Sequence, residues 1–328
     1  MHLYTLHQWL LLFYLYCFIG WIWESCYVSL EKHKWINRGF LKGPLLPIYG
    51  SGAIVVLFST LGIEENIILI FIIGMIVATI LEYITGATME KMFHVRYWDY
   101  SEKLFNINGH ICLLSSLTWG VFSILLVKFI NPPIASLIIS IPDQISEISA
   151  YIITIFITID GVQSFNEAMD LKNILIKITE RNEVIAHIKK RIEVVEAFVS
   201  EDIRVVQEKL IERSAIKQEE SLVKKQTRKQ FIEVVIRKNL DLKAEKIKVL
   251  SNKVSKYIGK FDEPSKLKSE FSGYLARLKI HEECINNTEN NIYVNSINIL
   301  RRNPNAKSKK YEEAMKEVKD LDKELNDK

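Results

Sequence analysis

Three carboxylates stand inside long apolar stretches of this sequence: Glu24, Glu82 and Asp160. A charged side chain within a bilayer is costly, so such residues commonly serve binding, ion pathways or proton transfer. At a rise of ~1.5 Å per residue, Glu24 and Glu82 lie ~24 Å into their expected helices, whereas Asp160 lies ~16 Å into its own, near mid-membrane. The alternatives are an interfacial salt bridge with a loop base for each glutamate, and a packing hydrogen bond for Asp160.

An arginine follows each of the two glutamates at the same distance. Arg38 comes fourteen residues after Glu24, and Arg96 comes fourteen residues after Glu82. This spacing indicates a weak internal repeat of two hairpins that run in the same direction, an arrangement known in transporters. Chance matching of so few positions is the alternative. We expect each arginine to pair with the glutamate of its own hairpin, or to cross to the glutamate of the other.

Glycine and proline crowd the stretch from Gly43 to Gly52, where the second apolar segment begins. Pro44 suits a helix start, but Pro47 and Gly50 are not needed for one. A broken helix that offers backbone groups to a substrate is one explanation. Close packing of the glycines against a neighbouring helix is the other explanation.

Aromatic, acidic and amide side chains mix in the loop of residues 96–112. Its tryptophan and tyrosine residues are typical of a membrane interface. Asp99, Asn106 and Asn108 do not fit that explanation, although Asn108 could cap the helix that follows. The loop therefore predicts a folded rim on the cytoplasmic side.

Together these features predict one binding site at the cytoplasmic mouth of a helix bundle. Asp160 is expected at its floor, and Tyr49 with the backbone of residues 43–52 is expected to line it. Such a pocket would be acidic or neutral and would favour a cation, a proton or a zwitterion over an anion. No Cys/His spacing predicts zinc and no phosphate-binding glycine loop occurs, so no catalytic set, metal or cofactor is expected. The candidate substrate- or ion-binding residues are Glu24, Arg38, Tyr49, Glu82, Arg96, Asp99, His110 and Asp160.

Membrane helices must position these side chains, and each needs about 20 mostly apolar residues. The first apolar segment is not a cleavable signal peptide, because no base precedes it and its apolar stretch is too long. Residues 134–141 are apolar but too short to span, and predict a short interfacial helix. The sequence thus predicts an all-α fold with a five-helix transmembrane bundle in a domain of residues 1–170, its helices at residues 8–30, 44–62, 67–89, 108–130 and 149–169.

The basic residues of this first half gather in two loops. Of its eight Lys and Arg residues, seven lie in the loops after the first and third apolar segments. The opposite loops carry acidic residues and no base. The positive-inside rule therefore predicts a multi-pass protein of the cell membrane, with the N-terminus outside and the tail in the cytoplasm.

Residues 171–328 predict a cytoplasmic helical or coiled-coil domain with 35 Lys and Arg against 26 Asp and Glu. Apolar heptad positions from Leu171 to Val199 form a seam with one polar break, at Arg181. The seam packs on later segments of the same chain, or it joins a second copy in a homo-oligomer. The later amphipathic segments lie near residues 200–213, 219–240, 242–261 and 264–284. The basic runs lack interleaved aromatics, which argues against a nucleic-acid partner. A solvated face rich in Lys and Glu explains the basic excess better than attraction to anionic lipid heads. The lipid bilayer is the expected partner of the apolar helices.

Three motifs occur in order: FIGWIWES, NRGFLKGPLLPIYGSGA and LEYITGATMEKMFHVRYWDYSEKLFNINGHICL. They resemble the bacterial membrane family called putative ABC-transporter type IV, or CmpB-like putative ABC transporter permeases. The resemblance covers about residues 10–170 and implies a membrane domain of about five helices with a permease role and no defined substrate. Family members tend to have Trp and Arg where this chain has Tyr97 and His110, so a fixed positive charge at His110 is not required.

Three functions fit these features. A transport or membrane-complex subunit is the first, and without an ATPase motif of its own it would need a separate ATPase subunit or an ion gradient. A membrane-anchored structural or signalling protein working through its coiled tail is the second. An interfacial lipid-modifying enzyme is the third, and it requires four groups within reach of one another: Glu24, Glu82, Asp99 and His110. The sequence favours the first function and a non-enzymatic role.

Overall fold

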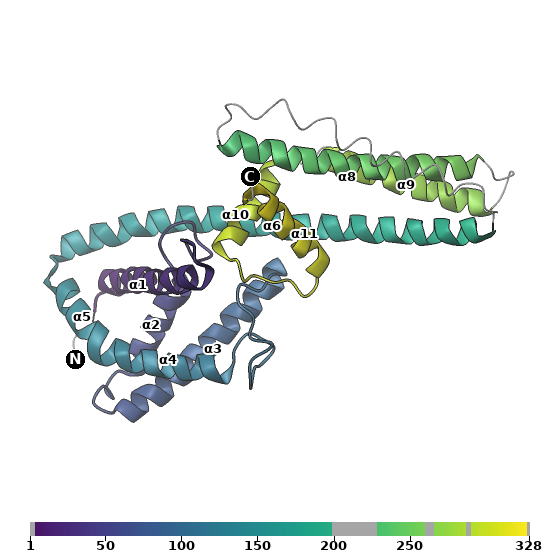
Figure 1. Ribbon diagram of the computed structural model, residues 1–328. Helices are drawn as coiled ribbons and strands as arrows, with labels where there is room; N and C mark the ends of the chain where they lie inside the picture. Colours follow the sequence, from purple (N-terminus) through teal and green to yellow (C-terminus); the bar gives the residue numbers. More distant parts are fainter. Residues whose placement is uncertain (1–3, 199–227, 260–265, 287–289, 327–328) are drawn as a thin grey trace. The chain divides into compact units, whose positions relative to one another are not determined.

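The computed structural model describes residues 4–198, 228–259, 266–286 and 290–326, and within these ranges it is all helical (Figure 1). No strand occurs among the described residues, which contain only two isolated β-bridges. The chain divides into two compact units, each described here by itself. The first unit comprises Met1–Asn173 and Asn295–Met315, and the second comprises Ile174–Val294 and Lys316–Lys328. The domain boundary at residue 170 stays a prediction.

The first unit holds the apolar segments, and the last of their helices continues past it into the second unit. Among the described residues, four helical stretches are long and apolar enough to cross a membrane: Leu6–Lys32, Ile67–Phe93, Leu113–Ser140 and Asp143–Val194. The second apolar segment forms a shorter helix of 13 residues. The elements are α1 (Leu6–Lys32), α2 (Pro47–Ser59), α3 (Ile67–Phe93), α4 (Leu113–Leu125), the π-helical turn η1 (Leu126–Ile130), α5 (Asn131–Ser140) and α6 (Asp143–Phe198).

Local sequence explains where these helices begin and end. The Asn66 side chain caps α3 by accepting hydrogen bonds from two backbone N–H groups of its first turn. Both α1 and α3 run for 27 residues and end at a histidine in the left-handed conformation, His33 and His94. The fourth segment starts later than expected because Asn108 and Gly109 have positive φ angles of 54° and 76°, which a helix cannot include.

Asn108 therefore does not cap α4, contrary to the prediction. Cys112 is the N-cap: its Sγ accepts from the Ser115 N–H at 3.4 Å, and its own N–H donates to the Ser115 hydroxyl at 3.1 Å. At its other end α4 continues through η1 into α5. The segment expected as a separate interfacial helix is thus the end of a longer helical stretch.

A row of isoleucines marks the outer face of α3. They recur at every fourth position and each is at least 42% exposed: Ile68, Ile72, Ile76, Ile80 and Ile84. Residues four apart share one helix face, so this face is apolar and unpacked within the chain, as a lipid-facing surface is. The core of the unit lies between α1, α2, α3 and η1, where Leu12, Val56, Ile70 and Leu126 cluster.

Glycine packing joins α2 closely to α1. A Cβ atom added at Gly50 would collide with the Cys17 sulfur and would lie 2.7 Å from the Phe13 carbonyl oxygen. Pro47 is the first residue of α2, an ordinary helix start, because the helix begins three residues later than the sequence suggested. The glycine and proline of this stretch are therefore explained by packing and helix initiation, without a broken helix.

The second unit packs part of α6 with three helices of the tail: α8 (Arg228–Ile258), α9 (Lys266–Asn286) and the greater part of α11 (Glu312–Asn326). In Figure 1, α8 and α9 run side by side. Seam residues Ile178, Ile188 and Ile192 are buried within the chain. Arg181, the polar break, donates to the Glu317 carboxylate at 2.8 and 2.9 Å, and Lys243 also contacts Glu317. The segment expected at residues 200–213 lies outside the described residues, as does the start of the segment at 219–240.

We predict that Gly50→Ala destabilises the full-length protein by about 2 kcal/mol, because overpacking a close helix contact costs roughly 1–3 kcal/mol. Gly52→Ala is the matched control, since its Cβ would lie 3.4 Å from the Trp119 ring, an ordinary contact. Thermal unfolding in detergent, followed by scanning fluorimetry, measures both. Equal melting temperatures for the two variants would contradict the packing explanation.

Candidate functional site

A cavity of about 310 Å³ lies within the first unit. Residues from α1, α2, α3, α4 and α6 line it, together with the loops before α2 and after α3. The lining is mostly aromatic and apolar, with three charged side chains. Its polar and aromatic members are Glu24, Arg38, Phe40, Tyr49, Glu82, Thr85, Phe93, Tyr97, Trp98, Tyr100, Trp119, Phe165 and Asn303.

Glu24 and Arg38 form the ion pair that their spacing predicted. The Arg38 Nε lies 3.5 Å from a Glu24 carboxylate oxygen, and the Tyr49 hydroxyl donates to the other oxygen at 2.8 Å. Arg38 is 8% exposed and also donates to the Tyr97 carbonyl at 3.0 Å and to the Asn303 side-chain oxygen. A guanidinium buried to this extent needs such partners, because an unpaired charge away from water is strongly destabilising.

Glu82 lines the same cavity with different partners from those expected. It is 6% exposed and accepts hydrogen bonds from the Tyr100 hydroxyl at 3.3 Å and from the Trp119 indole N–H at 3.2 Å. Arg96 does not reach it, because that arginine pairs elsewhere. Both donors are neutral, so they bind the carboxylate without balancing its charge.

Tyr97 also lines the cavity. Its hydroxyl is buried, without accessible surface, and makes no hydrogen bond within the part of the chain that the structure describes. Burial raises the pKa of Tyr97 well above its ordinary value, so the hydroxyl stays protonated.

Arg96, Asp99 and His110 form a second cluster that does not line the cavity. Arg96 donates to Glu90 at 2.7 Å and to Asp99 at 3.1 Å, while the His110 Nε2 lies 3.2 Å from Glu90. Burial opposes ionisation of Asp99, but hydrogen bonds from Ser101 and Arg96 outweigh it and lower the pKa of Asp99. Burial lowers the pKa of His110 despite the nearby Glu90 carboxylate. The sequence predicted one site at the cytoplasmic mouth, but the structure divides its residues between the cavity and this second cluster.

Asp160 anchors a loop and is not at the floor of the cavity. Its two carboxylate oxygens accept the backbone N–H groups of Lys42 at 2.9 Å and Gly43 at 2.8 Å. The Lys42 ammonium lies 3.0 Å from a Glu167 oxygen, so a second carboxylate of α6 holds the same loop. This loop carries Arg38 and ends at α2, and Asp160 therefore helps to position the cavity wall.

Residues 295–308 supply contacts that the sequence reasoning missed. They include the end of α10 (Asn290–Arg302), where Arg302 pairs with Glu167 at 2.7 Å. The next residue, Asn303, lines the cavity and donates to the Gly39 carbonyl at 2.9 Å. Further on, Lys307 exchanges backbone hydrogen bonds with Arg96 at 2.8 and 2.9 Å. The only sequence signal was the polar run RRNPN at residues 301–305, which carries no recognisable spacing.

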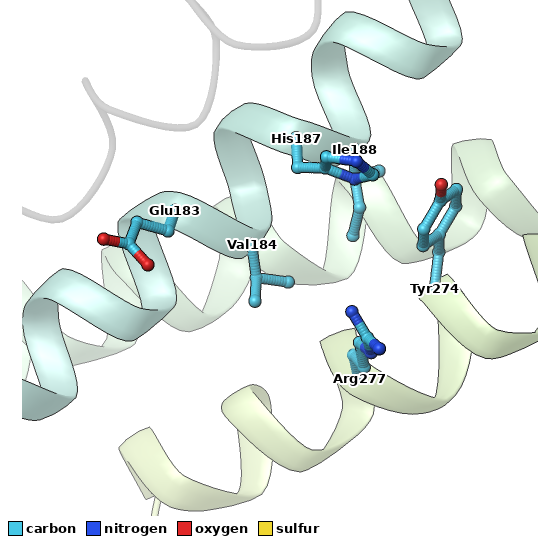
Figure 2. Close-up of a pocket in the computed structure, with 6 residues that line it drawn as sticks. All are labelled: Glu183, Val184, His187, Ile188, Tyr274 and Arg277. Atoms are coloured by element: carbon cyan, nitrogen blue, oxygen red, sulfur yellow. The ribbon is translucent and has the colours of Figure 1, made fainter.

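A smaller cavity of about 160 Å³ lies in the second unit, between α6 and α9. Figure 2 shows Tyr274 and Arg277 of α9 across from Val184 and Ile188 of α6. Nearby, Arg191 pairs with Glu270 at 2.8 Å, and this pair with the Tyr274 hydroxyl lowers the pKa of Glu270 to about 2. These contacts are those of a helix interface, and the larger cavity is the better candidate site.

We predict that Asp160→Ala speeds amide hydrogen exchange at Lys42 and Gly43 at least tenfold, because both N–H groups lose their acceptor. Exchange measured by mass spectrometry on the full-length protein in nanodiscs tests this. Gln163→Ala is the control, since Gln163 accepts from the Lys42 ammonium, at 3.3 Å, and from neither backbone N–H group. Unchanged exchange in Asp160→Ala would show that other contacts hold the loop.

Residues 11–165 match the family model described as Putative ABC-transporter type IV. The match confirms the resemblance seen in the three sequence motifs, and it includes every lining residue of the cavity except Asn303. Comparisons with curated proteins and with solved structures found no match. Residues 11–165, which build nearly all of the cavity, are thus similar to the Putative ABC-transporter type IV family.

Proposed function

We propose that this chain is the permease-type subunit of a membrane transporter and that the cavity of about 310 Å³ is its solute site. The cavity is the observation that carries the proposal, since it combines the buried Glu82 and the half-buried Glu24 with aromatic walls inside the segment that matches the family. Sites for small molecules are typically largely apolar with a few placed polar groups, and begin at about 300 Å³.

A separate ATPase subunit supplies the energy in this proposal. The sequence contains neither G-x-x-x-x-G-K-[ST] nor G-x-G-x-x-G, and the family is described by ABC transport. A membrane-anchored structural or signalling protein, the anchor hypothesis, needs no cavity. An interfacial lipid-modifying enzyme needs Asp99 and His110 beside Glu24 and Glu82. Asp99 and His110 belong to the second cluster instead, so neither alternative uses the site as it is built.

The proposed topology has five crossings, with the N-terminus outside and the C-terminal helical domain in the cytoplasm. The seven bases in two loops support it. The α2 helix of 13 residues is about 20 Å long at ~1.5 Å per residue, so residues flanking it complete its crossing. A reporter fused after Lys328 is expected to read as cytoplasmic and one before His2 as external. A reading of both on the same side would mean that α2 does not cross.

Filling the cavity tests the transport proposal. Thr85 lines it, whereas its neighbour Ile84 is 56% exposed on the outer face of α3. The full-length protein purified from native membranes is expected to bring an ATPase with it. We predict that Thr85→Trp changes the rate of ATP hydrolysis at least twofold, because the cavity is blocked, and that Ile84→Trp leaves the rate within experimental error.

Two results would contradict this proposal. If no ATP hydrolysis co-purifies with the wild-type chain, the permease role fails and the anchor hypothesis takes its place. If Thr85→Trp and Ile84→Trp hydrolyse ATP at the wild-type rate, the cavity is not the solute site. Melting temperatures of both variants control for misfolding.

A further inference from the structure

Charge in the cavity is unbalanced by one negative group. Its three charged lining residues are Glu24, Arg38 and Glu82. Arg38 pairs with Glu24 at 3.5 Å and fills its other positions with the Tyr97 carbonyl and Asn303. Glu82 therefore remains as the carboxylate whose charge the wall does not neutralise.

No lysine, arginine or histidine of the described ranges forms an ion pair with Glu82. Its hydrogen-bond donors Tyr100 and Trp119 are neutral, and Glu82 is only 6% exposed to solvent. A buried carboxylate is stable when a positive group shares its site. The cavity beside it is the place from which such a group can come.

Aromatic side chains line the cavity beside this carboxylate. Tyr49, Trp98, Tyr100 and Trp119 all line the cavity, and the rings of Tyr49 and Trp119 lie 5.6 Å apart at 47°. The negative face of an aromatic ring attracts an organic cation, and rings grouped around a carboxylate bind ammonium compounds in this way. Met89, Met92 and Phe165 extend the apolar wall.

A metal ion fits the same cavity poorly. Calcium takes 6–8 oxygen ligands and magnesium an octahedral set, as a general rule for hard cations. Among the described residues no group of three or more His, Cys, Asp or Glu side chains could hold a metal. The wall offers rings and methyl groups where a metal would need oxygens, so an organic cation suits it better.

The geometry points to a small organic monocation of the alkylammonium class as the ligand of this cavity, with its nitrogen between Glu82 and the rings of Tyr49, Trp98 and Trp119. This inference rests on the proposed solute site and adds the class of solute.

Choline and its neutral isostere 3,3-dimethyl-1-butanol provide the test, because they share shape and hydroxyl and differ in charge. Isothermal titration calorimetry of the full-length protein in nanodiscs is expected to give choline at least tenfold tighter binding. Glu82→Gln should reduce that ratio to within about twofold. Glu147→Gln is the matched control, since exposed Glu147 also accepts from a tyrosine hydroxyl, that of Tyr151 at 3.2 Å, and should keep the full ratio.

Trp119→Leu is a second variant, in case Glu82→Gln does not fold. It removes one aromatic face and should weaken choline at least fivefold while leaving the neutral isostere within twofold.

Equal affinity for choline and the isostere, or a full charge preference in Glu82→Gln, would overturn the inference. If the wild-type protein does not bind choline at concentrations up to about 10 mM, where even a very weak complex would form, the inference is overturned as well. None of these results touches the transport proposal, which stands or falls on the co-purifying ATPase and its response to Thr85→Trp.

Discussion

The buried guanidinium of Arg38 holds the candidate site together. Its partners come from three parts of the chain that are far from one another in sequence: the Glu24 carboxylate of α1, the Tyr97 carbonyl after α3 and the Asn303 side chain near the C-terminus. A guanidinium carries five donors in a rigid plane, so one side chain can satisfy all three acceptors at fixed angles. Because a buried charge is tolerated only when it is paired, these three segments must meet wherever Arg38 is buried.

The charge of the cavity follows from this arrangement. Arg38 pairs with Glu24 and donates to two neutral acceptors, and Arg96 pairs with Glu90 and Asp99. Neither arginine is left for Glu82, whose donors Tyr100 and Trp119 are neutral. A single carboxylate in an aromatic wall has a stronger field than it would have in water, since the low dielectric of the interior screens it less.

Contacts from α6 and from residues 295–308 fix two loops of the first unit. Asp160 and Glu167 of α6 hold the loop that carries Arg38, through Lys42 and Gly43. The C-terminal residues hold the loop after α3 through the backbone pair of Arg96 and Lys307. The family match ends at residue 165, so part of the wall of this cavity comes from outside the matched segment.

The sequence by itself determined the apolar helices, the family resemblance of residues 11–165 and the pairing of Glu24 with Arg38, because these depend on residue type and on short spacing along one hairpin. Only the tertiary structure decided which carboxylate stays unpaired. The loop after α3 turns Arg96 toward Glu90 and brings Tyr100 back to Glu82, although both residues lie in the same short loop. Asn303 is 265 residues from Arg38, and no periodicity links positions so far apart, so their contact exists only once the helices have packed.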